Sequence, residues 1–227
     1  MGKLYVVATP IGNLGDISFR AVEILKNVQF ILAEDTRVSK RLLKKYQIHT
    51  QLVSYRDQNH ARVIEKIHEK LDLGLDLALI SDAGTPGISD PGYKLISELK
   101  RNGYEIVPVP GPNAAIAALS VSGLPTDKFI FLGFLPKSDG KRLQILGEYM
   151  ELEASVILYE SPNRIIKLLQ QIGEIDNNRK ICVAIEITKL HEKIVTGDMA
   201  DVMKTLAEIS DSGNLRGEFV VIIQKAG

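Results

Sequence analysis

The sequence predicts an α/β protein built from two domains, each with its own sheet. Short runs rich in β-branched and apolar residues, such as LYVVA (4–8) and LALI (77–80), alternate with longer segments of helical periodicity, such as 92–102. Strands that alternate with helices of this length are typical of βαβ units and a largely parallel sheet. Later in the chain, ICVAIEI (181–187), KIVTG (193–197) and EFVVII (218–223) favour antiparallel pairing. We therefore expect a mostly parallel N-terminal sheet and a mixed C-terminal sheet.

The remaining elements follow the same alternation. Further strands are expected at 30–33, 105–109, 129–134 and 155–159, and further helices at 17–27, 36–46, 61–71, 112–121, 162–172 and 198–209. The segment SVSGLPTDK (120–128) interrupts the pattern near the middle of the chain with a glycine and a proline. We predict an N-terminal domain over 1–121, a C-terminal domain over 122–227, and a ligand cleft between them.

Composition excludes several classes of protein. The 227 residues are 45% hydrophobic and 25% charged, with 28 basic and 28 acidic side chains, so any nucleic-acid contact must come from local clusters of charge. The single cysteine, Cys182, permits no disulfide framework and is expected to be a buried thiol. No apolar run approaches the roughly 18 residues of a membrane span, and the N-terminal run is too short for a signal peptide. We expect a cytoplasmic protein.

The loop SDAGTPGISDPG (81–92) directly follows a predicted strand. In open α/β sheets, ligands bind beyond the carboxyl ends of the strands, where glycine lets the backbone approach them closely. Asp82 is suited to accept hydrogen bonds from a ligand, and Gly84 admits close approach. Asp90 and Pro91 have an ordinary explanation as the cap and first turn of the next helix. The first half of the loop has no such explanation, and we interpret it as a ligand loop.

Two other strand ends carry similar loops. VPGPNAAIAALSVSG (109–123) places Pro-Gly-Pro before a helix of very small residues, which also permits tight packing of helix on sheet. VATPIGNLGDIS (7–18) has glycines after the first strand, with Asp16 or Ser18 as the cap of the next helix. It is neither the dinucleotide fingerprint nor a P-loop. We expect both loops to face a ligand.

AEDTRVSKRLLKKYQI (33–48) predicts a helix with one basic face. Glu34 and Asp35 stand at the strand end, where carboxylates either cap a helix or act chemically. At about 100° per residue, one face is apolar, comprising Val38, Leu42, Leu43 and Tyr46. The other face is basic and is interpreted as a contact for a polyanion, comprising Arg37, Lys40, Arg41, Lys44 and Lys45.

Two strand ends in the second half also carry ionisable groups. In LYESPNR (158–164), Tyr159 and Glu160 end a strand, with Ser161 as the expected cap of a helix. IEITKLHEK (185–193) gathers Glu186 and Lys189 beyond another strand, a spacing found in acid–base sites and in ordinary surface loops. No metal site is expected, because neither Cys-x-x-Cys nor His-Glu-x-x-His occurs. No Gly-x-Ser-x-Gly elbow occurs either, which argues against a serine hydrolase.

Several motifs together resemble a known family. VATPIGNLGDIS, AEDTR, SDAGTPGISDPG, PGPNAAIAALSVSGLPTD, FLGFLP, YESPNR, EITKLHE and GEFVVII closely resemble the ribosomal RNA small subunit methyltransferase I family, within the tetrapyrrole methylase superfamily. The match runs from about residue 4 to residue 223. It implies a class III methyltransferase fold, a homodimer, and S-adenosylmethionine bound in the cleft. It also implies methylation of the ribose 2′-hydroxyl of a cytidine in the decoding region of 16S rRNA, within the 30S subunit.

The resemblance also implies which residues bind the cofactor. By their position in the motifs these are Ile11, Asp82, Gly84, Thr85, Ala114, Ala115, Tyr159, Ala184 and Gly217. Three segments depart from the family pattern: Asn163 stands where a histidine is usual, Ile185 and Ile187 replace arginine and leucine, and YRDQN (55–59) replaces a histidine-containing segment. We expect no essential role for the side chains that are missing at these positions.

The chemistry of the implied reaction suggests candidate catalytic groups. A ribose hydroxyl is a poor nucleophile at neutral pH, so loss of its proton during attack accelerates the reaction. From their strand-end positions, the candidates for base or orienting group are Glu34, Asp35, Glu160 and Glu186. Arg37 and Lys189 are expected to hold phosphate. Two alternatives remain: a methylase of a small, tetrapyrrole-type molecule, and a non-catalytic RNA-binding assembly factor.

Overall fold

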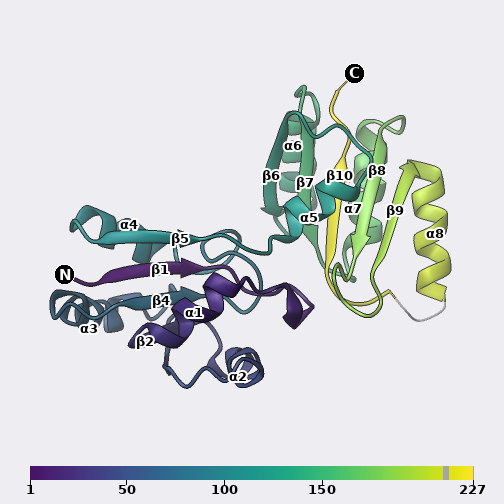
Figure 1. The fold of residues 1–227 in the computed structure, drawn as a ribbon. Helices are drawn as coiled ribbons and strands as arrows, with labels where there is room; N and C mark the ends of the chain where they lie inside the picture. Colours follow the sequence, from purple (N-terminus) through teal and green to yellow (C-terminus); the bar gives the residue numbers. More distant parts are fainter. Residues whose placement is uncertain (212–214, 227) are drawn as a thin grey trace. The chain divides into compact units, whose positions relative to one another are not determined.

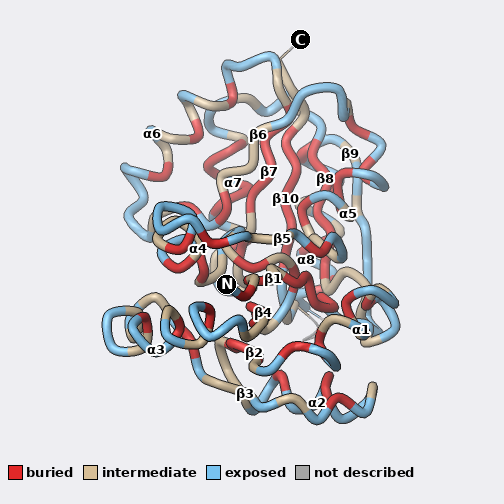
Figure 2. Tube along the Cα trace, turned by 60° about the vertical axis from the view of Figure 1, so that its left-hand side comes forward, coloured by how far each residue is buried: buried red, intermediate tan, exposed pale blue. Residues whose placement is uncertain are grey.

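The computed structural model describes residues 1–211 and 215–226 and divides the chain into two compact units, Met1–Asn113 and Ala114–Gly227 (Figure 1). Each unit is an α/β domain, as predicted, and each contains one five-stranded sheet. Figure 2 shows that the buried residues are concentrated along the strands, with the exposed residues on the outer turns of the helices. Among the described residues, no helix combines the length and apolar character needed to cross a membrane.

The first domain has a fully parallel sheet. Its strands are β1 (Lys3–Val7), β2 (Phe30–Ala33), β3 (Gln51–Ser54), β4 (Leu77–Ile80) and β5 (Glu105–Val109), arranged in the order β3-β2-β4-β1-β5. Helices α1 (Phe19–Asn27) and α2 (Thr36–Lys45) cover one face, and α3 (His60–Asp72) and α4 (Tyr93–Arg101) cover the other. A short 3-10 helix, η1, spans Leu14–Asp16.

Two apolar layers hold the first domain together. Leu25 of α1 and Leu43 of α2 pack with one set of strand residues, while Leu71 of α3 and Leu99 of α4 pack with the opposite set. All four residues of β4 are buried, as expected for a central strand with helices on both faces. Because the strands are parallel, their carboxyl ends lie at one edge of the sheet. The loops that carry the predicted site leave the sheet at that edge.

The second domain has the mixed sheet that the sequence predicts. Strands β6 (Phe129–Phe134), β7 (Ser155–Glu160), β8 (Lys180–Ile185), β9 (Lys193–Asp198) and β10 (Phe219–Ile223) have the order β6-β7-β10-β8-β9. Only β6 and β7 are parallel, and the other three pairs are antiparallel. Helix α5 (Ala114–Val121) packs on one face, and α6 (Asp139–Met150), α7 (Ile165–Ile175) and α8 (Met199–Asp211) pack on the other.

The boundary between the units falls earlier than the sequence suggests. The break at 120–128 places the helix of small residues in the N-terminal domain, 1–121. In the structure that helix, α5, belongs to the second unit, because Ala115 and Ala118 pack against Ile157, Cys182 and other residues of the second sheet. Cys182 is a buried free thiol, as expected.

Several predicted element boundaries are wrong. Helix α4 begins at Tyr93 and has Gly92 at its cap, so Asp90 and Pro91 lie in the preceding loop and not in the helix. Helix α7 begins at Ile165, and Ser161 bonds to Glu160 rather than capping it. Strand β3 and helix α6 were not predicted. Ser18 does cap α1, accepting a hydrogen bond from the N–H of Ala21 at 3.1 Å.

Candidate cofactor-binding and active site

The 81–92 loop is fastened to the end of β1 in the first domain. The N–H of Thr9 donates to the carbonyl of Gly84 at 2.8 Å, and the N–H of Gly84 donates back to the carbonyl of Thr9 at 3.0 Å. The hydroxyl of Thr9 also donates to the carbonyl of Ser81 at 3.1 Å. Gly84 has a φ of +83°, in the left-handed region that favours glycine. The loop therefore has a defined shape, set by its backbone.

Three residues that the resemblance assigns to the cofactor lie together at this point. A Cβ on Gly84 would lie 3.4 Å from Cγ2 of Ile11 and 3.9 Å from the carbonyl oxygen of Pro112. The hydroxyl of Thr85 donates to that same carbonyl of Pro112 at 3.2 Å. The loops after β1, β4 and β5 are thus joined into one surface at the carboxyl edge of the sheet.

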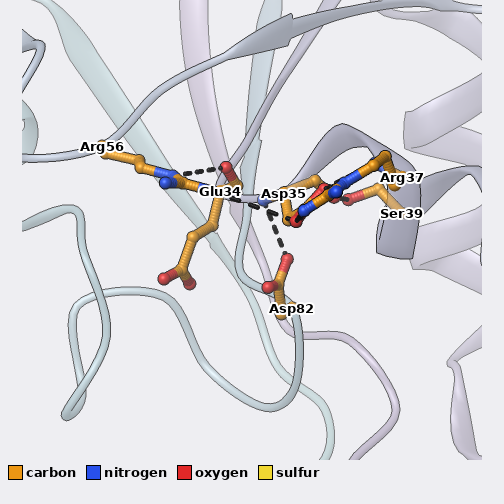
Figure 3. Close-up of polar contacts among 6 residues, drawn as sticks. All are labelled: Glu34, Asp35, Arg37, Ser39, Arg56 and Asp82. Atoms are coloured by element: carbon orange, nitrogen blue, oxygen red, sulfur yellow. Dashed lines mark hydrogen bonds and ion pairs between the residues drawn. The ribbon is translucent and has the colours of Figure 1, made fainter.

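Asp82, the fourth such residue in this domain, joins the ends of β4 and β2. Its Oδ1 accepts a hydrogen bond from the N–H of Asp35 at 3.0 Å (Figure 3). Asp35 is itself the cap of α2 and accepts from the N–H of Arg37 at 2.8 Å. The guanidinium of Arg37 lies 2.6 Å from Oδ2 of Asp35. Hydrogen bonds from the Arg37 side chain and backbone therefore hold the pKa of Asp35 well below its ordinary value.

Glu34 has the opposite electrostatic setting. Figure 3 shows its side chain extending away from the ion pair of Asp35 and Arg37. Burial first, and then the charge of Asp82, raise the pKa of Glu34 above its ordinary value. The nearby guanidinium of Arg56 and the N–H of Asp82 oppose this rise without cancelling it. Of the two adjacent carboxyls at the end of β2, Glu34 therefore binds a proton more readily than Asp35.

Arg56 is a residue of this site that sequence reasoning did not identify. It follows β3, and its Nε donates to the carbonyl oxygen of Glu34 at 3.0 Å (Figure 3). Its Nη2 lies 4.0 Å from Oδ2 of Asp35, and half of its side chain is exposed. The next acidic residue, Asp57, accepts from the N–H of Gly92 at 3.2 Å. The segment after β3 thus supports both Glu34 and the end of the 81–92 loop.

The basic face of α2 is largely as predicted. Its exposed cations are Arg37, Lys40, Arg41, Lys44 and Lys45, while Leu42 and Leu43 are buried. Arg37 differs from the lysines because it pairs with Asp35. Val38 was expected on the apolar face but is 49% exposed, since buried Ser39 takes its place and donates a hydrogen bond to the carbonyl of Asp35 at 3.1 Å.

In the second domain, four residues assigned to the cofactor also lie together. The N–H of Ala115, in the first turn of α5, donates to the hydroxyl of Tyr159 at 3.1 Å. Val220 of β10 lies between two of them in the sheet, paired with Tyr159 of β7 on one side and with Ala184 of β8 on the other. Ala114, Ala115, Tyr159 and Ala184 belong to the apolar cluster between α5 and this face of the sheet.

Glu160 is buried and fully engaged within its own domain. Its Oε1 accepts from the N–H of Ser161 at 2.7 Å and from the Ser161 hydroxyl at 3.1 Å. Its Oε2 accepts from Nη2 of Arg164 at 2.7 Å. Only 1% of its side chain is exposed. These contacts order the turn between β7 and α7.

Glu186 and Lys189 form a second internally paired group. Nζ of Lys189 lies 2.7 Å from Oε1 of Glu186 and 2.8 Å from Oε2 of Glu218. Burial raises the pKa of Glu186, but hydrogen bonds from Lys189 and from the N–H of Glu218 outweigh it, so the net shift is downward. Gly217 has a φ of +86°, and a Cβ there would lie only 2.0 Å from Oε1 of Glu186. Gly217 thus makes room for the Glu186 carboxylate.

Metal ligation finds no support in the part of the chain that the structure describes. No group of three or more His, Cys, Asp or Glu residues is placed to hold an ion there. His60 and His68 instead share one carboxylate, with their Nε2 atoms 2.8 Å and 3.4 Å from the two oxygens of Glu98.

Comparison with known proteins places the chain in one family. A family model described as Tetrapyrrole (Corrin/Porphyrin) Methylases matches residues 3–203. A protein of Rickettsia prowazekii named Ribosomal RNA small subunit methyltransferase I is 45% identical, over 97% of this chain and 77% of its own. Proteins of the same name are 45% identical in a Hydrogenobaculum species, over 98% and 96%, and 43% identical in Thermotoga maritima, over 92% and 97%.

Solved structures share the fold at lower identity. The X-ray structure of a cobalamin biosynthetic enzyme, cobalt precorrin-4 methyltransferase, has a TM-score of 0.70 at 16% identity, over 98% of this chain and 94% of its own. Uroporphyrin-III-C-methyltransferase from Thermus thermophilus has a TM-score of 0.64 at 19% identity, over 99% and 95%. These two structures support the two-domain fold.

Proposed function

Because this chain belongs to the tetrapyrrole methylase family, and within it to the ribosomal RNA small subunit methyltransferase I proteins, we propose that it methylates ribosomal RNA of the small subunit. The methyl donor is S-adenosylmethionine. The acceptor is the 2′-hydroxyl of a cytidine in the decoding region of 16S rRNA, within the 30S subunit. We also propose that the chain acts in the cytoplasm as a homodimer.

The first domain offers groups that fit the proposed cofactor. One oxygen of Asp82 is bonded to the N–H of Asp35, and its carboxylate retains lone pairs for a ribose hydroxyl or an ammonium group. The backbone at Gly84 carries no side chain, and Ile11 beside it supplies an apolar contact. Ile11, Asp82, Gly84 and Thr85 are our proposed contacts here. The contributions of Ala114, Ala115, Tyr159, Ala184 and Gly217 stay predictions, as does a site shared by both domains.

The proposed mechanism assigns proton removal to Glu34. When bound, S-adenosylmethionine supplies an electrophilic methyl group, so the protein must place the attacking oxygen in line and take its proton. Glu34 accepts this proton at its carboxylate. Arg56 orients Glu34 through its backbone carbonyl, and Asp35 fixes the start of α2. The lysines on α2 hold phosphates of the RNA, whose ribose must be unstacked to react.

One observation carries this assignment among the four candidate carboxylates. Asp35, Glu160 and Glu186 are each held by an arginine or a lysine within 2.7 Å. Glu34 has no such ion pair among the described residues, and its pKa is raised. A carboxylate that already stabilises its charge through an ion pair is a weaker base. Glu34 is therefore our proposed base.

Two measurements on the full chain separate this function from its rivals. Calorimetry tests binding of S-adenosylmethionine, and a labelled methyl group then tests transfer to 30S subunits from a strain that lacks the modification. We expect binding, followed by label in 16S rRNA at a 2′-O-methylated cytidine. Binding without transfer to RNA would instead favour a small-molecule methylase. Absence of binding would favour a non-catalytic assembly factor.

A further inference from the structure

Strand β6 of the second domain contains an irregularity that changes which side chains share a face. Phe131 pairs with Ile157, but Gly133 pairs with Leu158 and Phe134 with Tyr159, so Leu132 is an extra residue. Side chains three positions apart in a regular strand point to opposite faces. The inserted residue brings Phe131 and Phe134 to the same face. Gly133, with a φ of +62°, permits this local conformation.

The result is a cluster of three aromatic rings at the edge of the sheet. The ring of Tyr159 lies 4.9 Å from that of Phe131 and 5.5 Å from that of Phe134, with interplanar angles of 67° and 61°. We call Phe131, Phe134 and Tyr159 the aromatic platform. Edge-to-face contacts hold each ring in a defined orientation. In the described sheet, β6 is an edge strand that pairs with β7 on one side only.

The platform is open to a ligand on its outer side. Phe134 is 60% exposed, whereas its neighbour Leu135 is buried. The inner side is fixed, because the Tyr159 hydroxyl accepts the N–H of Ala115 at 3.1 Å. Leaving most of a phenylalanine ring in water forgoes the stability that its burial would give. A rigid aromatic ring kept in this way is suited to stacking.

Positive charge follows directly after the platform. The chain continues as LPKSDGKR (135–142), in which Lys137 and Lys141 are exposed. Nη2 of Arg164 donates to the carbonyl oxygen of Leu135 at 2.9 Å. Proteins that bind single-stranded nucleic acid combine aromatic side chains for the bases with cations for the backbone.

We propose that the aromatic platform binds one nucleobase of the RNA by stacking on Phe134, with Lys137 near the adjoining phosphate. This inference rests on the proposed function, in which RNA is the substrate. A platform that reads only the π-face accepts any base, so it positions the strand without selecting its sequence. The adenine of S-adenosylmethionine has the same stacking chemistry, and the experiment below distinguishes the two sources.

The absence of tryptophan from the sequence gives a direct test. Phe134→Trp places a single indole on the platform of the full chain, and a base that stacks on it quenches its fluorescence. Phe129→Trp, at the other end of the same strand and also partly exposed, is the matched control. The probes are S-adenosylmethionine, then a short single-stranded RNA of mixed sequence, and then unmethylated 30S subunits.

We expect RNA and 30S subunits to quench Phe134→Trp, and S-adenosylmethionine to leave it unchanged. Phe129→Trp should respond to none of the three. Quenching by the cofactor alone would assign the platform to adenine and overturn the proposal. Equal quenching of both variants by RNA would indicate non-specific contact and would also overturn it.

A second pair of variants measures the contribution of stacking. Phe134→Ala should bind the RNA roughly tenfold or more weakly, while Phe134→Tyr should bind it as the wild type does. Methyl transfer to 30S subunits by the wild-type protein is measured on the same preparations. If the wild type transfers methyl groups but Phe134→Ala binds RNA normally, the proposed role of the aromatic platform is wrong and the proposed function stands. If the wild type transfers none, the proposed function fails, and the platform fails with it.

Discussion

Glu34 and Glu186 occupy equivalent places in the two domains and differ in their partners. Each directly follows a strand, each is partly buried, and each lies near a second carboxylate. Lys189 lies 2.7 Å from Glu186, whereas no lysine or arginine forms an ion pair with Glu34 among the described residues, and burial and the charge of Asp82 disfavour its ionised form. The net shift of the pKa is upward for Glu34 and downward for Glu186. A position at the end of a strand therefore does not by itself make a carboxylate a base. Its strength as a base also depends on whether an ion pair already stabilises its charge.

The cations differ in the same way. Lys40, Arg41 and Lys44 of α2 are exposed along one helix, while Lys189 is paired with both Glu186 and Glu218. The first arrangement leaves positive charge for a polyanion. The second joins β8 to the segment before β10 and leaves no net positive charge. Among the described residues, Glu34 and these three cations of α2 therefore make no ion pair, whereas Glu186 and Lys189 pair with each other.

Replacing Glu34 should have the largest effect. We expect Glu34→Gln to slow methyl transfer to 30S subunits by about 10²- to 10⁴-fold, because it removes the proton acceptor. Binding of S-adenosylmethionine should persist. Glu186→Gln, the matched change in the second domain, should alter the rate of the folded enzyme only slightly. Rates measured at saturating cofactor and subunits check this, and equal losses in both variants would remove the distinction.

Gly217→Ala should have the next largest effect, on stability. The new Cβ would meet the Glu186 carboxylate at 2.0 Å, and the φ of +86° is strained for alanine. Together these should lower the free energy of unfolding by about 3 kcal/mol, measured by denaturant titration. Gly123→Ala is the control, since its φ is +70° but no atom lies within 4 Å of the new Cβ. It should cost about 1–2 kcal/mol. Equal losses would show that Glu186 is not confined.

The cations of α2 should govern the salt dependence of RNA binding. Changing Lys40, Arg41 and Lys44 together to glutamine should reduce the slope of log affinity against log salt by about 2, since each phosphate contact on a single strand contributes about 0.7. Lys189→Gln should leave the slope unchanged, because its charge is already compensated. Binding titrations at several salt concentrations test this. A larger change for Lys189→Gln would contradict the proposed division of charge.

The smallest expected effects are on the pH dependence of stability, and they are opposite in sign for Glu34 and Glu186. The raised pKa of Glu34 means that its negative charge lowers the free energy of unfolding. This destabilisation is absent below the ordinary pKa of 4.5, where the carboxyl is protonated in both states, and it is complete above the pKa of the folded state. The lowered pKa of Glu186 means stabilisation above 4.5 that is lost as the pH falls through its folded pKa. At neutral pH, Glu34→Gln should therefore raise the melting temperature slightly, and Glu186→Gln should lower it. Melting curves from acid to neutral pH measure both, and shifts of the same sign would contradict the argument.

The sequence predicted most of the fold because its strongest patterns are local. The fully buried run of β4 and the amphipathic α2 are visible in single windows of residues. Strand β3 was missed because it is a short edge strand, QLVS, with only partly buried or exposed residues. Helix α6 was missed because Gly140 and Gly147 interrupt its helical pattern. Arg56 was missed as a consequence, since it follows the strand that was not predicted.

Sequence reasoning named candidate residues for the site but could not predict their contacts. Their positions after strands identified Glu34, Asp35 and Asp82 as separate candidates, and the structure shows that the N–H of Asp35 donates to Asp82. Local sequence cannot reveal that Lys189 meets Glu218, which lies 29 residues later. Nor can it reveal the extra residue in β6, which depends on pairing with β7. Both depend on register between distant segments.

The most direct test of the central claim is the pH dependence of methyl transfer in a single turnover. The wild-type rate should rise with pH through a pKa above 4.5, the ordinary value for glutamate, as Glu34 loses its proton. Glu34→Gln should be slow and lack this rise, while Glu186→Gln should retain it. A rise that persists unchanged in Glu34→Gln, or that disappears only in Glu186→Gln, would contradict the assignment of Glu34 as the base.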